Sequence, residues 1–116
     1  MTNEILNMKQ LDLVSGGNRA QTGADRLFFQ KLGYNINKVH PEDAFAGNGV
    51  KCRIPNDYYD NEYQILTDGE WTKYPHWAAL GYVLAKNHYS GFNGSWTDSN
   101  YVHSFLKENL GITNLG

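Results

Sequence analysis

The sequence lacks several features that would narrow its function. Its 116 residues contain a single cysteine, Cys52, so no internal disulfide can form and packing must hold the fold together. No apolar run approaches the roughly 18 residues of a membrane span, and no basic segment followed by an apolar one opens the chain. We therefore expect neither a transmembrane segment nor a Sec-type signal peptide.

An excess of charge of one sign is also missing. Ten basic and twelve acidic side chains give a formal net charge of −2. Nucleic-acid-binding proteins, and peptides drawn to membranes by charge, need a basic excess. The near-neutral balance argues against both classes, so we expect no nucleic-acid partner.

Aromatic side chains, in contrast, are abundant. Eight Tyr, five Phe and three Trp make up 14% of the chain, and hydrophobic residues make up 41%. Such a composition is typical of a folded chain, and the length allows one domain. The aromatic residues are either a stacking platform for a sugar or a partner protein or, more simply, the core.

The N-terminal stretch Ile5–Gly17, ILNMKQLDLVSGG, ends in a pair of glycines. On a helix Leu6, Leu11 and Val14 share an arc of about 140°. This pattern resembles the double-glycine leader of bacterial peptides that are exported by ABC transporters with a cysteine-peptidase domain. Gln10 and Asn7 stand where that family usually has Glu and Ser. The residues that carry the resemblance are Leu6, Leu11, Val14, Gly16 and Gly17.

The resemblance implies a route for the protein. In that family a leader helix docks its apolar residues on the peptidase, and the chain is cut after the second glycine, here Gly17. Glycines suit a narrow cleft that admits only bare backbone. Residues 1–17 would then be the leader and residues 18–116 the mature, secreted domain. The alternative is an ordinary amphipathic helix that ends at a glycine C-cap.

Residues 47–52, GNGVKC, partly resemble the YGNGV-x-C box of pediocin-like bacteriocins, which also use double-glycine leaders. Ala46 replaces the tyrosine of that box, and the second cysteine is missing. Asn48-Gly49 is also a common turn signal, and it favours a tight turn before a strand at Val50–Ile54.

The rest of the chain predicts a small α+β domain, mostly helical with a short antiparallel sheet. Residues 18–23 are polar and suit an accessible linker between leader and domain. The strands are expected within 57–67 and at 70–74, on either side of a turn at Asp68-Gly69. The helices are expected from Thr22 or Asp25 to Leu32, from Pro41 to Gly47, from Pro75 to Gly91, and from Asp98 to Leu110.

The core expected from this pattern draws on three of these helices. Cys52 is expected to be buried and unreactive, as a lone cysteine in an apolar strand usually is. The predicted core residues are Leu27, Phe28, Leu32, Trp77, Leu80, Leu84, Phe105 and Leu106.

Catalytic and metal chemistry find little support in the sequence. Cys52 with one of the four histidines would make a nucleophile pair, but no local motif marks it. The histidines show no metal-ligand spacing, and we expect them at the surface or in caps. A carbohydrate-cleaving site needs two carboxylates, one of them desolvated. The acidic residues near aromatics are Asp57, Asp60, Glu62, Asp68 and Glu70.

Two classes of function remain open. The first is a secreted bacteriocin-like effector or intercellular signal, whose partners would be the peptidase-containing ABC exporter and a receptor or immunity protein. The second is a small enzyme, directed at cell wall or carbohydrate, or an immunity-type binding protein. We predict no catalytic residues, no metal site and no cofactor.

Overall fold

The computed structural model describes residues 19–55, 60–113 and 115. These residues form a compact α+β domain of four α-helices and a three-stranded antiparallel sheet, about 46% helical, which confirms the predicted fold class. The predicted leader, with Leu6, Leu11, Val14, Gly16 and Gly17, lies outside the described residues. In chain order the elements are α2 (Arg19–Lys31), α3 (Pro41–Ala46), β1 (Val50–Arg53), β2 (Glu62–Thr67), β3 (Glu70–Tyr74), α4 (His76–Lys86), α5 (Ser99–Phe105) and the π-helical turn η1 (Leu106–Leu110).

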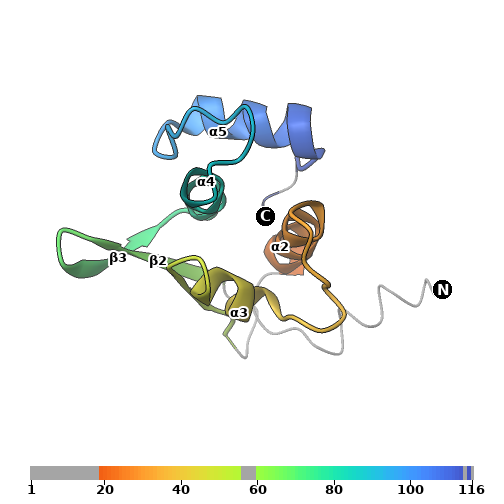
Figure 1. Cartoon of the computed structure of the whole chain (residues 1–116). Helices are drawn as coiled ribbons and strands as arrows, with labels where there is room; N and C mark the ends of the chain where they lie inside the picture. Colours follow the sequence, from red (N-terminus) through yellow and green to blue (C-terminus); the bar gives the residue numbers. More distant parts are fainter. Residues whose placement is uncertain (1–18, 56–59, 114, 116) are drawn as a thin grey trace.

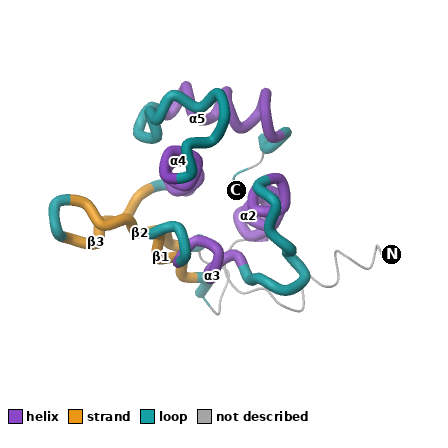
Figure 2. Tube along the Cα trace, viewed as in Figure 1, coloured by secondary structure: helices purple, strands orange, loops and turns teal. Residues whose placement is uncertain are grey.

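The helices surround the base of the sheet and leave one hairpin projecting. Figure 1 shows α4 and α5 together above the sheet, α3 below and α2 at the side. α4 packs against β2, α5 and α2, and α3 packs against β1. The tip of the β2–β3 hairpin points away from the helices, at the left of the tube in Figure 2. One sheet face is therefore covered near the helices, while the hairpin tip meets solvent.

The sheet has the order β1-β2-β3, with both pairs antiparallel. The β2–β3 register places Thr67 opposite Glu70 and Leu66 opposite Trp71. The connecting residues have positive φ, 53° at Asp68 and 81° at Gly69, as a two-residue type I′ turn requires. The turn predicted from the Asp-Gly pair is thus confirmed.

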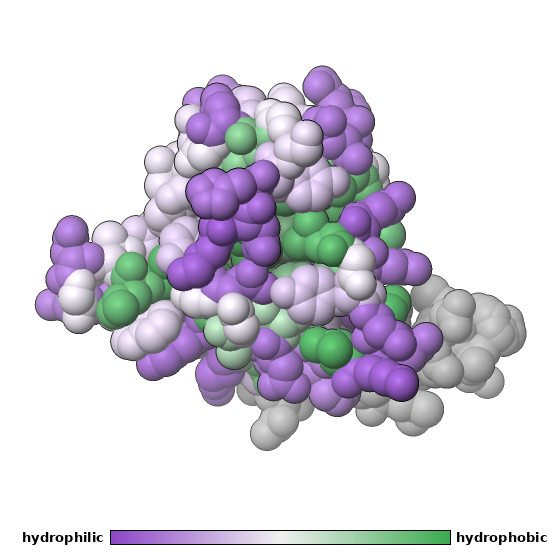
Figure 3. Space-filling view, viewed as in Figure 1, coloured by the Kyte–Doolittle hydropathy of each residue, from purple (hydrophilic) through white to green (hydrophobic). Residues whose placement is uncertain are grey.

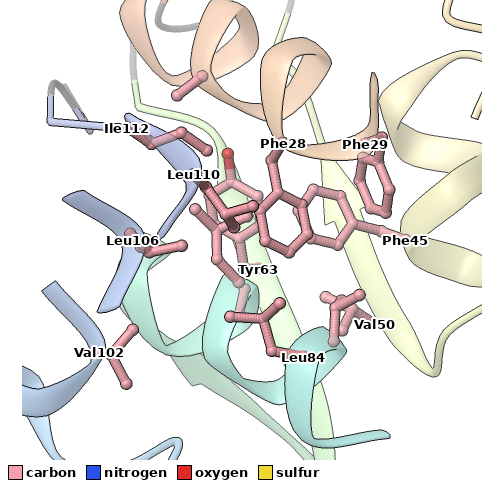
Figure 4. Close-up of a cluster of buried hydrophobic side chains, with 14 of the residues drawn as sticks. Phe28, Phe29, Phe45, Val50, Tyr63, Leu84, Val102, Leu106, Leu110 and Ile112 are labelled. Atoms are coloured by element: carbon pink, nitrogen blue, oxygen red, sulfur yellow. The ribbon is translucent and has the colours of Figure 1, made fainter. Parts of the chain in front are cut away.

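Buried and more exposed residues alternate along β2, so the sheet has an inner and an outer face. Tyr63 and Ile65 are only 2% and 1% exposed, and Val50 of β1 pairs with Ile65 on the same inner face. Figure 4 shows the core into which these side chains point, with Phe28, Phe45 and Leu84 around Tyr63. Edge-to-face contacts join the rings, for example Phe29 to Phe45 at 4.9 Å. The aromatic excess is in large part core.

The predicted start of the first described helix was wrong. α2 begins at Arg19, so residues 19–23 are helical and do not form the expected accessible linker. Gln21 and Thr22 are buried, because their side chains bond to Asn61 just before β2. A polar segment that looks like a linker in sequence is the buried polar face of a helix.

The later helices follow the sequence more closely. α3 begins with Pro41 and ends at Ala46, close to the expected bounds. α4 ends at Lys86, five residues before the predicted stop at Gly91. Asp98 caps α5 by accepting a hydrogen bond from the Tyr101 N–H, as its type and position predicted.

Five of the eight predicted core residues are buried: Phe28, Leu80, Leu84, Phe105 and Leu106. Leu32 and Trp77 are partly buried and pack against the core. Leu27 was a wrong prediction, since it is 37% exposed. It lies on the solvent side of α2 because the neighbouring Phe28 and Phe29 take the core positions. Cys52 is half-buried, not buried as predicted.

Candidate functional site

The most unusual buried group is the carboxyl of Asp25, on the inward face of α2. Its side chain has no exposed surface, and burying an ionisable carboxyl is costly unless it is hydrogen-bonded. Two partners meet it. Tyr63 of β2 donates its hydroxyl to Oδ2 at 2.8 Å, and Nε2 of His76 lies 2.5 Å from Oδ1. We call these three side chains the Asp25 network.

Three elements position the network. Asp25 lies one helical turn after Gln21 on α2, Tyr63 is an inward residue of β2, and His76 is the first residue of α4. The rings of Tyr63 and His76 stack, with centroids 4.7 Å apart and planes 8° from parallel. The stacking fixes the imidazole so that Nε2 faces the carboxyl.

The opposite edge of the imidazole is also occupied. Nδ1 of His76 lies 3.0 Å from the backbone carbonyl oxygen of Leu115. A carbonyl oxygen can only accept, so Nδ1 must carry a proton. The Nε2–Oδ1 contact then holds one further proton, either on His76 as an ion pair or on Asp25 as a neutral pair. In both arrangements the pair carries two protons and no net charge.

Both pKa values in this pair are raised. Burial raises the pKa of Asp25 and outweighs its hydrogen bonds to His76 and Tyr63. Burial alone would lower the pKa of His76, but the hydrogen bond and charge of Asp25, with the Leu115 carbonyl, raise it. The pair therefore keeps its shared proton to a higher pH than a free histidine does.

A second set of polar contacts continues the network toward solvent. Asn61 donates its backbone N–H to Gln21 at 2.8 Å and its side-chain amide to Thr22 at 3.0 Å. A surface pocket of about 580 Å³ opens beside these groups, with Tyr63 and His76 among its walls. The network therefore lies against a concave, partly polar surface.

The contacts limit what the network can do chemically. A general base needs a ring nitrogen that faces a substrate, and both nitrogens of His76 already have protein partners. Asp25 likewise uses both of its oxygens. The arrangement joins α2, β2, α4 and the C-terminal tail, and this joining is the role that the geometry supports.

The other sequence candidates are not brought together. Cys52 of β1 lines a separate pocket of about 390 Å³ with Glu42 and Arg53. Burial, together with the charges of Asp25 and Glu42, raises the pKa of the Cys52 thiol. The raised pKa favours the protonated thiol at neutral pH, and the lack of reactivity stays a prediction.

Of the acidic residues proposed for a carbohydrate site, Asp60 and Glu62 line the pocket beside the network, but neither is desolvated. Glu62 is 3.2 Å from Arg53 and 3.8 Å from Lys73 on the outer sheet face. Asp60, Asp68 and Glu70 are exposed, and Asp57 lies outside the described residues. The desolvated carboxyl is Asp25, which the sequence marked only as a possible helix start. Within residues 19–55, 60–113 and 115, no three potential metal ligands gather.

Sequence reasoning missed His76, which was expected at the surface or in a cap and is only 6% exposed. The polar residues of α2 were missed for a related reason, because they were assigned to a linker. Helical spacing of Gln21 and Asp25 was an available signal, since the two lie on one side of a helix.

Comparisons with known proteins do not assign the chain to a family. No protein-family model, no curated protein and no solved structure matches the chain. Among the helices that the structure describes, none has the length and apolar character needed to cross a bilayer.

Proposed function

We propose that the protein is the precursor of a secreted bacteriocin-like effector or intercellular signal. A peptidase-containing ABC exporter recognises residues 1–17 as a double-glycine leader and cuts after Gly17. The proposal rests on the sequence pattern Leu6, Leu11, Val14 and Gly16-Gly17 at the N-terminus.

The small enzyme and the immunity-type binding protein were the alternatives. The Asp25 network lends no support to an enzyme, because each nitrogen of His76 and each oxygen of Asp25 contacts a protein group. We therefore assign the network to the stability of the mature domain.

The test is mass spectrometry of the medium from cells that produce the chain with a double-glycine exporter. We expect a product that begins at Asn18. Gly17→Val should abolish cleavage, because a β-branched side chain does not fit a cleft for bare backbone. The matched control is Gly23→Val, outside the motif, since a Cβ added at Gly23 meets nothing within 4 Å. An intact chain in the medium, or equal processing of Gly17→Val, contradicts the proposal.

The apolar face of the leader gives a second, graded test. Leu11→Ser and Val14→Ser each remove an apolar side chain that would be buried on the peptidase. A fully buried side chain of this size contributes about 1.5–3 kcal/mol, so the rate of cleavage at limiting peptidase should fall by about tenfold or more. If both variants were cleaved at an unchanged rate, the apolar face of the leader would not be recognised by the peptidase, and that part of the proposal would be wrong.

A further inference from the structure

The projecting hairpin ends in an edge strand. β3 pairs with β2, and in the strand order β1-β2-β3 it lies at one side of the sheet. Glu70, Trp71, Thr72 and Lys73 are exposed, and Tyr74 is half-buried. Figure 3 shows apolar surface on the hairpin at the left of the molecule. Its large exposed apolar residues are Leu66, at 53%, and Trp71, at 42%.

The register shows which backbone groups point outward. In a two-residue hairpin the pair that flanks the turn, here Thr67 and Glu70, is hydrogen-bonded. Hydrogen-bonded pairs alternate along an antiparallel ladder, so Glu70, Thr72 and Tyr74 direct their N–H and C=O groups toward β2. Trp71 and Lys73 direct theirs to the outer edge, where no described strand pairs with β3. An exposed row of such groups is a template for another strand.

We propose that β3 pairs with β3 of a second copy of this chain, antiparallel about a two-fold axis at Thr72. A two-fold axis normal to the sheet keeps each residue on its own face, so Trp71 lies opposite the partner copy's Lys73 and the reverse. Both residues of each such pair offer outward groups, and four backbone hydrogen bonds form. The two three-stranded sheets become one sheet of six strands.

Charge favours this register over its neighbours. With Trp71 opposite Lys73, each cation lies beside an aromatic ring, and Trp71 already accepts the Lys51 amine 4.1 Å from its ring centroid. A shift by two residues in one direction sets Lys73 against Lys73, which is repulsive. In the other direction it sets Lys73 against Gly69 in the turn and leaves two fewer hydrogen bonds. Thr72 against Thr72 is a favourable cross-strand pair.

Cysteine trapping tests the pairing in the full chain with Cys52→Ala as background. In the proposed dimer Thr72 faces itself in a non-hydrogen-bonded pair with Cα atoms about 4.5 Å apart, within disulfide range. Glu70 is also exposed but would lie about 13 Å from its own copy along the strands. In a glutathione buffer, Thr72→Cys should accumulate as a covalent dimer at least about tenfold faster than Glu70→Cys. Equal rates, or no dimer from Thr72→Cys, overturn the proposal.

Sedimentation of the unmodified chain provides a second measurement. The monomer–dimer equilibrium should shift with protein concentration, and Lys73→Pro should abolish it. Proline at this position removes an outward N–H and the exposed Lys73 amine near Glu62, but no hydrogen bond to β2, so circular dichroism should show the same fold. A chain that stays monomeric at all concentrations contradicts the pairing, as does a Lys73→Pro variant that dimerises as before. Neither outcome bears on cleavage after Gly17.

Discussion

The Asp25 network and the β2–β3 hairpin differ in the kind of side chain that each buries or exposes. The network buries polar groups and gives each of them a partner, whereas the hairpin exposes Leu66 and Trp71. A buried polar group must be paired to be tolerated, so the network belongs to the stability of the fold. Exposed apolar residues contribute little to stability, so the hairpin is where contacts with other molecules are expected.

The largest effect should follow from removing the centre of the network. Asp25→Ala leaves the Tyr63 hydroxyl and His76 Nε2 without their partner in the interior, and should lower the free energy of unfolding by about 3–5 kcal/mol. Asp25→Asn is the matched control, because its amide can donate to a neutral imidazole while its oxygen accepts from Tyr63. Urea denaturation of both variants measures the difference. Equal losses would mean that volume, not bonding, matters at this position.

The network should also make stability depend on pH. Because the folded pair keeps a proton that unfolded histidine loses above its ordinary pKa of 6.5, the folded state then binds more protons than the unfolded state. The free energy of unfolding should fall as pH rises above that value, by up to about 1.4 kcal/mol per unit. Denaturation from pH 6 to pH 9 measures the slope. Asp25→Asn should flatten it, and an unchanged slope in that variant would assign the effect to other groups.

The helix that carries His76 depends on a close approach at Gly81. A Cβ there would lie 3.1 Å from Val102 Cγ2 and 3.2 Å from Trp96 Cα. Gly81→Ala should therefore lower the free energy of unfolding by about 1–3 kcal/mol, as overpacking does. Gly23→Ala in α2 is the opposite case, because its Cβ meets nothing within 4 Å, and it should stabilise by about 0.5–1 kcal/mol. Thermal unfolding of the two variants compares them, and the same sign for both would contradict the packing argument.

The smallest effect is expected in the hairpin. Leu66→Ala should change the free energy of unfolding by less than about 0.5 kcal/mol, because the side chain is half exposed. Ile65→Val, on the inner face of the same strand, removes only one methylene yet should cost about 0.5–1.5 kcal/mol. Chemical denaturation measures both. A larger loss of unfolding free energy from Leu66→Ala would show that the hairpin contributes to stability as the core does, and would contradict the contrast between the two regions.

The sequence predicted the parts of the fold that local signals control. Asp68-Gly69 marked the hairpin, Pro41 the start of α3, and Asp98 the start of α5, because turns and caps depend on a few adjacent residues. The start of α2 and the end of α4 were missed. α2 begins early because Gln21 and Thr22 find distant partners at Asn61, and a contact across forty residues leaves no local pattern.

The candidate site was harder still to predict, because its contacts also join residues that are distant in the sequence. Asp25 and His76 are fifty-one residues apart in the chain and meet only when α2 and α4 flank β2. Taken singly, each residue is of a type usually found at the surface. The exposed Trp71 was one of many aromatics in sequence, and only the pairing of β2 with β3 separated it from those in the core.

The central claim is that Gly17 divides a removable leader from a domain that folds without it. The most direct measurement compares the free energy of unfolding of residues 1–116 with that of residues 18–116, by urea denaturation under identical conditions. We predict equal values, within about 0.5 kcal/mol, because a segment that is removed during maturation cannot supply core that the mature domain needs. A loss of several kcal/mol on truncation would show that residues 1–17 belong to the fold, and would contradict the claim.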